Sequence, residues 1–162
     1  MCADLNQLVQ NKENIPSLPT IFNQINLAVD DPKSSMRDIA QIISADQSLS
    51  ARLLRLVNSA FFGFPSKIDT ISHAVTIIGK KQLRDLALAT SVIQMFRGIP
   101  SHLIQVRPFW EHSIGCGIAS RLLASFHKVP NIEQFFVTGL LHDIGRLILY
   151  NHNPEQAKEA LT

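Results

Sequence analysis

Apolar residues recur at intervals of three and four positions along nearly all of the chain, and extended runs of alternating polar and apolar residues are scarce. This spacing is typical of amphipathic helices that pack together through one face. It predicts a first helix that ends at 30–32. Four further helices are predicted from 34 or 35 to about 45, from 46–48 to about 58, from 70 or 72 to 78, and from 80 to 96. Two more are predicted over 109–127 and 131–150, and another begins near 154. The expected fold class is all-α, a multi-helix bundle.

A connector near the middle of the chain divides these helices into two groups. Its helix-breaking residues are Gly98, Pro100 and Pro108. The sequence therefore predicts an N-terminal helical unit over 15–97 and a second unit over 105–162. The second unit has only two complete helices, which bury too little apolar surface to fold alone. We expect it either to pack on the first unit or, as the favoured interpretation, to be part of a longer bundle that is truncated on its C-terminal side.

The composition excludes several classes of protein. Of the 162 residues, 46% are hydrophobic and 17% charged, which rules out a disordered chain. A net charge of +2 is too small to indicate nucleic-acid binding. The two cysteines, Cys2 and Cys116, lie far apart, so we expect a reducing compartment rather than a disulfide framework. No signal peptide or uninterrupted apolar run of membrane-spanning length is visible, and a cytoplasmic protein without membrane contact is expected.

The residues with the most chemical potential are His142 and Asp143, which stand side by side in a strongly apolar segment. Each would be costly to bury without a partner. His112 lies thirty residues earlier on another predicted helix, and glycines at 115, 139 and 145 would let the two backbones approach closely. Two imidazoles and a carboxylate suit a borderline divalent ion such as iron, manganese or zinc. The alternative is that both histidines are satisfied core residues and that the Asp143 carboxylate orients an imidazole or caps a helix.

This arrangement resembles the HD superfamily of metal-dependent phosphohydrolases, in which an early His, a His-Asp doublet and a late Asp hold the metal. By that resemblance, His112, His142 and Asp143 would be metal ligands. The doublet is followed by Ile-Gly-Arg, where the cyclic-dinucleotide phosphodiesterases of the superfamily commonly have Ile-Gly-Lys. Arg146 keeps the positive charge but is not an equivalent proton donor.

Three segments in order narrow the resemblance to the HDOD (HD-related output domain) family. They are 46–60 (DQSLSARLLRLVNSA), 109–113 (FWEHS) and 139–143 (GLLHD). One departure is Gln47, where the family usually has Pro. The resemblance covers nearly all of residues 15–150, and ordinary HD hydrolases lack the first segment.

The resemblance implies an HD-like bundle that generally lacks the full ligand set and serves as a non-catalytic output module. Its partners would be sensor or response-regulator proteins of bacterial signalling. In this sequence the residues after Asp143 include no further Asp, only Glu155 and Glu159. An HD-type hydrolase needs a later carboxylate and an activated water, so the expected site is a vestigial metal site and not an enzyme centre. The alternative is an active metal-dependent phosphohydrolase that acts on nucleotides or cyclic dinucleotides.

Two further features have open interpretations. Asn58 and Ser59 can satisfy backbone groups at a helix end, which is the favoured interpretation, or contact a partner or ligand. Residues 36–58 also resemble a DNA-binding helix-turn-helix with Arg52 and Arg55 displayed. Against this, the second helix is rich in leucine and the turn lacks the usual glycine.

Overall fold

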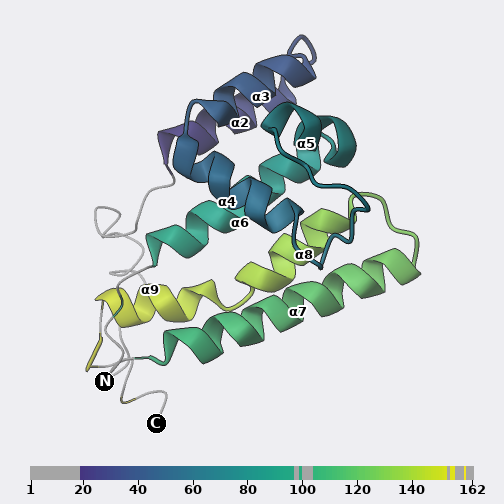
Figure 1. The fold of residues 1–162 in the computed structure, drawn as a ribbon. Coiled ribbons are helices and arrows are strands. Elements are labelled where there is room, and N and C mark those ends of the chain that lie inside the picture. The colour runs from purple at the N-terminus through teal and green to yellow at the C-terminus, as the bar shows by residue number, and fades with distance from the viewer. Residues whose placement is uncertain (1–18, 97–98, 100–103, 153, 156–158, 160–162) are drawn as a thin grey trace.

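The computed structural model describes residues 19–96, 99, 104–152, 154, 155 and 159, and the regular structure within these ranges is helical (Figure 1). The helices in chain order are α2 (Thr20–Asp30), α3 (Met36–Ser44), α4 (Gln47–Val57), α5 (Ile71–Ile78), α6 (Lys80–Met95), α7 (Val106–Phe126), α8 (Ile132–Leu141) and α9 (Ile144–His152). The all-α fold class predicted from the sequence is confirmed. None of the helices in the described part of the chain combines the length and the apolar character needed to cross a membrane.

Side-chain caps fix the starts of the N-terminal helices. At α3 the Ser35 hydroxyl accepts from the amide of Asp38, and the Asp38 carboxylate accepts from the amide of Ser35. At α4 the Asp46 carboxylate accepts from the amide of Leu49 at 2.9 Å, and this bond lowers the pKa of Asp46 below its ordinary value. Thr70 caps α5 by accepting from the amide of His73. These caps satisfy amides that lack a partner in the first turn of a helix.

The first unit is built around α6, which lies between the upper helices and the α7–α8–α9 layer (Figure 1). Its main core is a single apolar cluster to which α2 to α6 all contribute. The same cluster includes Phe136, Val137 and Leu140 of α8. A smaller cluster joins α6, α7 and α9 through Val92, Phe96, Phe109 and Leu147. The two predicted units therefore share both of these cores, and α8 packs directly on α6.

Arg121 of the second unit also contacts the first unit. Glu133 is buried at the start of α8, and its Oε1 accepts from Nε of Arg121 on α7 at 2.9 Å. The Arg121 guanidinium lies 4.6 Å from the ring centroid of Phe61 and 5.5 Å from that of Phe62, in the turn after α4. Arg121 thus pairs a buried carboxylate while it covers two aromatic rings of the first unit.

Two predicted boundaries are wrong. The helix at 109–127 begins earlier, at Val106, so that Pro108 lies in the first turn of α7. A proline is tolerated there because the first amides of a helix have no intrahelical acceptor. The single helix predicted over 131–150 is interrupted at His142 and Asp143, which form a turn between α8 and α9. The His-Asp doublet therefore lies in a break between helices and not inside one.

Candidate metal centre

Two glycines allow α7 and α8 to cross at very short range. A Cβ atom at Gly139 would lie 2.7 Å from the carbonyl oxygen of Cys116 and 2.9 Å from Cα of Gly117. A Cβ atom at Gly117 would lie 2.8 Å from the carbonyl oxygen of Phe136. The close approach expected at Gly139 is therefore present, but its counterpart is Gly117, since added Cβ atoms at Gly115 and Gly145 would meet nothing within 4 Å. This crossing sets how near the side chains of the two helices come.

Next to this crossing, the structure brings together His112, Cys116 and His142. One possible ligand atom from each lies within 4.8 Å of the others. The two imidazole rings are 5.4 Å apart between centroids, and Cys116 Sγ is 3.6 Å from Nε2 of His112. Both histidines are exposed and Cys116 is half-buried, so the group is open to solvent. Thus His112 and His142 are neighbours in space, and the third donor beside them is a thiol.

The side chain of His142 makes a hydrogen bond at the break after α8. Its Nδ1 lies 2.8 Å from the carbonyl oxygen of Gly139. In a continuous helix that carbonyl would accept from the amide of Asp143, so the side chain competes with the helical hydrogen bond. Because a carbonyl oxygen can only accept, Nδ1 carries the proton. Nε2 of His142 is then the nitrogen with a free lone pair, which is the state required of a metal ligand.

Asp143 does not join this group. Its Oδ2 accepts from Nη1 of Arg146 at 2.9 Å, and this hydrogen bond raises the pKa of Arg146 above its ordinary value. Arg146, a further candidate residue, thereby occupies the carboxylate that the HD resemblance assigns to a metal. The pairing with Arg146 engages one oxygen of the only carboxylate in the expected ligand set of His112, His142 and Asp143, and a metal-ligand role for Asp143 stays a prediction.

Asn58 and Ser59 act on the backbone. The Asn58 amide donates to the carbonyls of Leu54 and Ile68 at 2.8 and 2.7 Å, and its oxygen accepts from the amide of Ile68 at 2.8 Å. Ser59 donates to the carbonyl of Leu56 at 2.6 Å. These bonds end α4 and fasten the segment before α5, in agreement with the structural interpretation.

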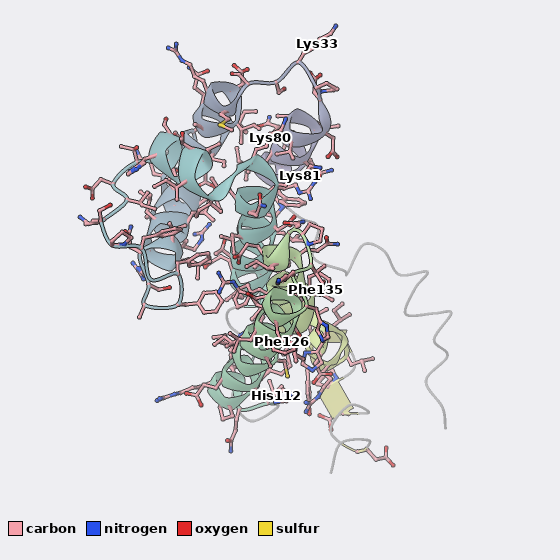
Figure 2. The ribbon with its side chains drawn as sticks, turned by 90° about the vertical axis from the view of Figure 1, so that its right-hand side faces the viewer. Lys33, Lys80, Lys81, His112, Phe126 and Phe135 are labelled. Atoms are coloured by element: carbon pink, nitrogen blue, oxygen red, sulfur yellow. The ribbon has the colours of Figure 1, made fainter. Side chains whose placement is uncertain are left out.

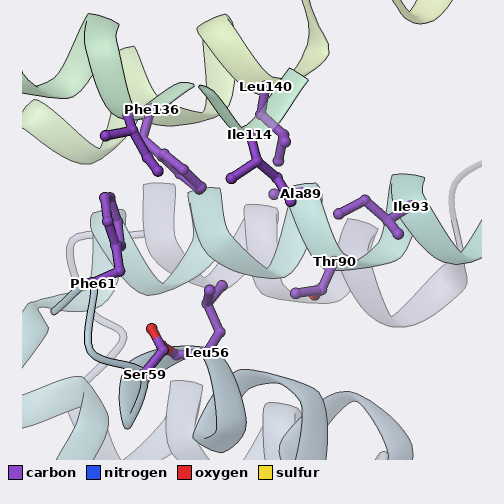
Figure 3. A pocket seen from close by; sticks show the side chains of 10 residues that line it. Leu56, Ser59, Phe61, Ala89, Thr90, Ile93, Ile114, Phe136 and Leu140 are labelled. Carbon is purple, nitrogen blue, oxygen red and sulfur yellow. The ribbon is translucent and has the colours of Figure 1, made fainter. Parts of the chain in front are cut away.

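A cavity of about 250 Å³ lies between α4, α6, α7 and α8, and Figure 3 shows Leu56 and Ser59 on one side of it and Phe136, Ile114 and Leu140 on the other. The described residues that line it include no charged side chain. Such a hollow does not suit a phosphate, which needs cationic or amide donors.

The helix-turn-helix alternative involves α3 and α4. Leu49, Leu53 and Val57 of α4 are buried in the main core. Of the two arginines that would read DNA, Arg52 is half-buried with Nη1 donating to Ser48, while Arg55 is exposed. DNA binding stays a prediction, and a salt-dependent gel shift would test it.

The sequence matches known proteins over nearly its whole length. The model of the family described as HDOD domain matches residues 15–162. The chain belongs to the HDOD family. The resemblance drawn from the segments at 46–60, 109–113 and 139–143 is thereby confirmed. Cys116 was not predicted from the sequence as a possible metal ligand. The available signal was its spacing of four residues from His112 on one predicted helix.

Similar proteins place this HDOD chain among longer relatives. An uncharacterized protein of Treponema pallidum (strain Nichols) is 29% identical over 144 residues, covering 88% of this chain and 28% of that protein. Two solved structures are from Shewanella amazonensis SB2B, and both carry names that give phosphohydrolase as an inferred activity. The one named metal-dependent has a TM-score of 0.77, 26% identity, and coverage of 98% of this chain and 59% of its own. The other has a TM-score of 0.72, 30% identity, and coverage of 94% and 53%. The chain thus spans little more than half the length of these structures.

Proposed function

We propose that this HDOD domain is a non-catalytic module of bacterial signal transduction, which works in the cytoplasm through contacts with other proteins. The observation that carries the proposal is a set of exposed apolar side chains on α7 and α8, here called the α7–α8 patch. It consists of Leu122, Leu123, Phe126 and Phe135, whose exposed fractions are 60%, 62%, 82% and 38%. Exposed apolar side chains gathered in one place mark protein interaction sites.

The setting of the patch indicates the chemistry of its partner. In the view of Figure 2, Lys80 and Lys81 lie above Phe126 and Phe135, and Lys33 lies at the upper end of the molecule. Aromatic residues at the centre and charges at the rim are typical of specific protein interfaces. A partner with an apolar stripe and acidic flanks would complement this side. Since HDOD-like modules occur beside two-component proteins, we propose a sensor or a response regulator as that partner.

The reactive residues support the absence of catalysis. Hydrolysis of the HD type needs carboxylate ligands and an activated water. The Asp143 carboxylate is engaged by Arg146, and the third donor beside the two histidines is Cys116. The chain's own residues at this place therefore position imidazoles and a thiol, with no free carboxylate in the group.

Photo-crosslinking in cells would test the proposal. A photoreactive phenylalanine analogue at Phe126 is expected to crosslink to a sensor or response regulator, and Leu123→Glu is expected to abolish the product. The same analogue at Asp69, exposed on the loop before α5, is the matched control. Crosslinks only to a second copy of this chain, or to the same proteins from position 69, would overturn the proposal.

A metal-dependent phosphohydrolase is the second candidate, supported by the proximity of His112 and His142 and by the names of the two Shewanella relatives. Assays with cyclic dinucleotides and Mn²⁺ would separate the two functions. Turnover that His142→Ala removes would establish the enzyme and overturn the non-catalytic module. If the original protein turns over no substrate faster than the His142→Ala variant does, the second candidate is excluded.

A further inference from the structure

We propose that His112, Cys116 and His142 form a zinc site of the thiolate–imidazole type, in which Cys116 takes the place that a carboxylate holds in HD hydrolases. This inference does not depend on the signalling function proposed above. It rests on two donors from α7 and one from the break after α8, and on the pairing of Asp143 with Arg146 outside this group.

The two donors on α7 already have the spacing that zinc requires. Zn–N bonds near 2.0 Å and Zn–S bonds near 2.3 Å at a tetrahedral angle place the N and S atoms about 3.5 Å apart. Cys116 Sγ and His112 Nε2 are 3.6 Å apart, one helical turn from each other. They could receive an ion without any change of backbone.

The third donor comes from the break after α8. The hydrogen bond to Gly139 holds the proton of His142 on Nδ1 and leaves Nε2 for the ion. A histidine ligand that donates its other N–H to a backbone carbonyl is a common arrangement at zinc sites, because it fixes the ring and raises its basicity. Since one ligand atom of each residue lies within 4.8 Å of the others and the histidines are exposed, a small rotation of the His112 ring would close the set.

The donor types decide which ion is bound. A thiolate and two imidazoles favour Zn²⁺, whereas Mn²⁺ and Mg²⁺ prefer carboxylate oxygens. Binding converts the Cys116 thiol into a zinc thiolate and releases its proton to solvent, so affinity rises with pH. A fourth position stays open to water or to a donor from elsewhere, because the group faces solvent.

Cobalt can report on the site without any assay of activity. In a Cys2→Ser background, Co²⁺ is expected to give a sulfur-to-cobalt charge-transfer band and the visible bands of a tetrahedral ion. Excess Zn²⁺ should bleach both. Cys116→Ser should abolish the charge-transfer band. Each of the single variants Cys116→Ser, His112→Ala and His142→Ala should weaken Zn²⁺ binding at least about tenfold in competition with a chelator.

Two control variants separate this site from the alternatives. His127→Ala removes another exposed imidazole at the end of α7, and Asp143→Asn removes the HD-type carboxylate. Both should leave zinc affinity within about twofold. Melting curves of the metal-free variants would show that each still folds. Weaker binding in Asp143→Asn with no effect of Cys116→Ser, a cobalt complex without the sulfur band, or no zinc binding at micromolar concentrations would each overturn the proposal.

Discussion

Nη1 of Arg146 lies 2.9 Å from Oδ2 of Asp143, three residues earlier in the chain, and the two side chains keep 40% and 28% of their surfaces exposed. The doublet carboxylate is thus part of a local ion pair at the start of α9. An aspartate inside an apolar helix, as the sequence predicts, would instead be a buried charge.

Asp143→Ala is therefore expected to change the free energy of unfolding by less than about 1 kcal/mol, because a half-buried pair between residues three positions apart on one helical turn contributes little. Urea denaturation followed by circular dichroism would measure this. Glu111→Ala, which breaks the exposed pair with Arg107, is the matched control and should behave alike. A loss of several kcal/mol from Asp143→Ala alone would contradict the assignment of this pair to the surface.

Gly139→Ala is expected to destabilise the protein by about 1–3 kcal/mol, since the new methyl group meets backbone atoms of α7 that cannot rotate away. Gly115→Ala is the control on the facing helix. Its Cβ meets nothing within 4 Å, and alanine favours the helix, so stability should rise by up to about 1 kcal/mol. Equal effects of the two substitutions in urea denaturation would show that the helices do not cross at Gly139.

Arg121→Ala is expected to lower the free energy of unfolding by about 3 kcal/mol, because it leaves the buried Glu133 carboxylate without its partner. Arg107→Ala removes an arginine from the same helix but from an exposed pair, and should cost less than about 1 kcal/mol. Thermal or urea unfolding of both variants gives the comparison. A cost for Arg121→Ala no greater than that of Arg107→Ala would contradict a stabilising role for the pair of Arg121 with Glu133.

Asp46 gives the stability a dependence on pH. Its pKa is lower in the folded protein than in the unfolded chain, so its contribution is present above the unfolded value of about 3.9 and is lost as the pH falls through the folded value. Asp46→Ala should cost about 1 kcal/mol at neutral pH through loss of the cap. Asp46→Asn keeps an oxygen acceptor but binds no proton, so its stability should fall less steeply in acid. A parallel acid dependence in Asp46→Asn and the original protein would contradict this.

Much of the fold could be predicted because its signals are local. Ser35, Asp46 and Thr70 start helices through hydrogen bonds to amides within three residues, and Pro32 lies beyond the end of α2. Such contacts depend on spacing along the chain, which the sequence displays directly.

The arrangement of the metal centre depends on contacts that the sequence does not display. The break at His142 is accompanied by a hydrogen bond between its ring and the carbonyl of Gly139, and the apolar spacing of the segment does not signal it. Gly117 was missed as the partner of Gly139 because the register of two crossing helices is set by tertiary packing. Because no break was predicted at this place, Cys116 was not recognised as a donor beside the two histidines.

The ring of His142 is fixed to the end of α8, so it cannot turn without loosening that helix. α9 begins two residues later and holds Leu147 fully buried against Val92, Phe96 and Phe109. A ligand that binds Nε2 of His142 therefore acts on the turn between α8 and α9. Of these helices, α8 packs in the main apolar cluster and α9 in the smaller one. The exposed side chain of His142 is thereby coupled to both apolar clusters through the two helices that flank it.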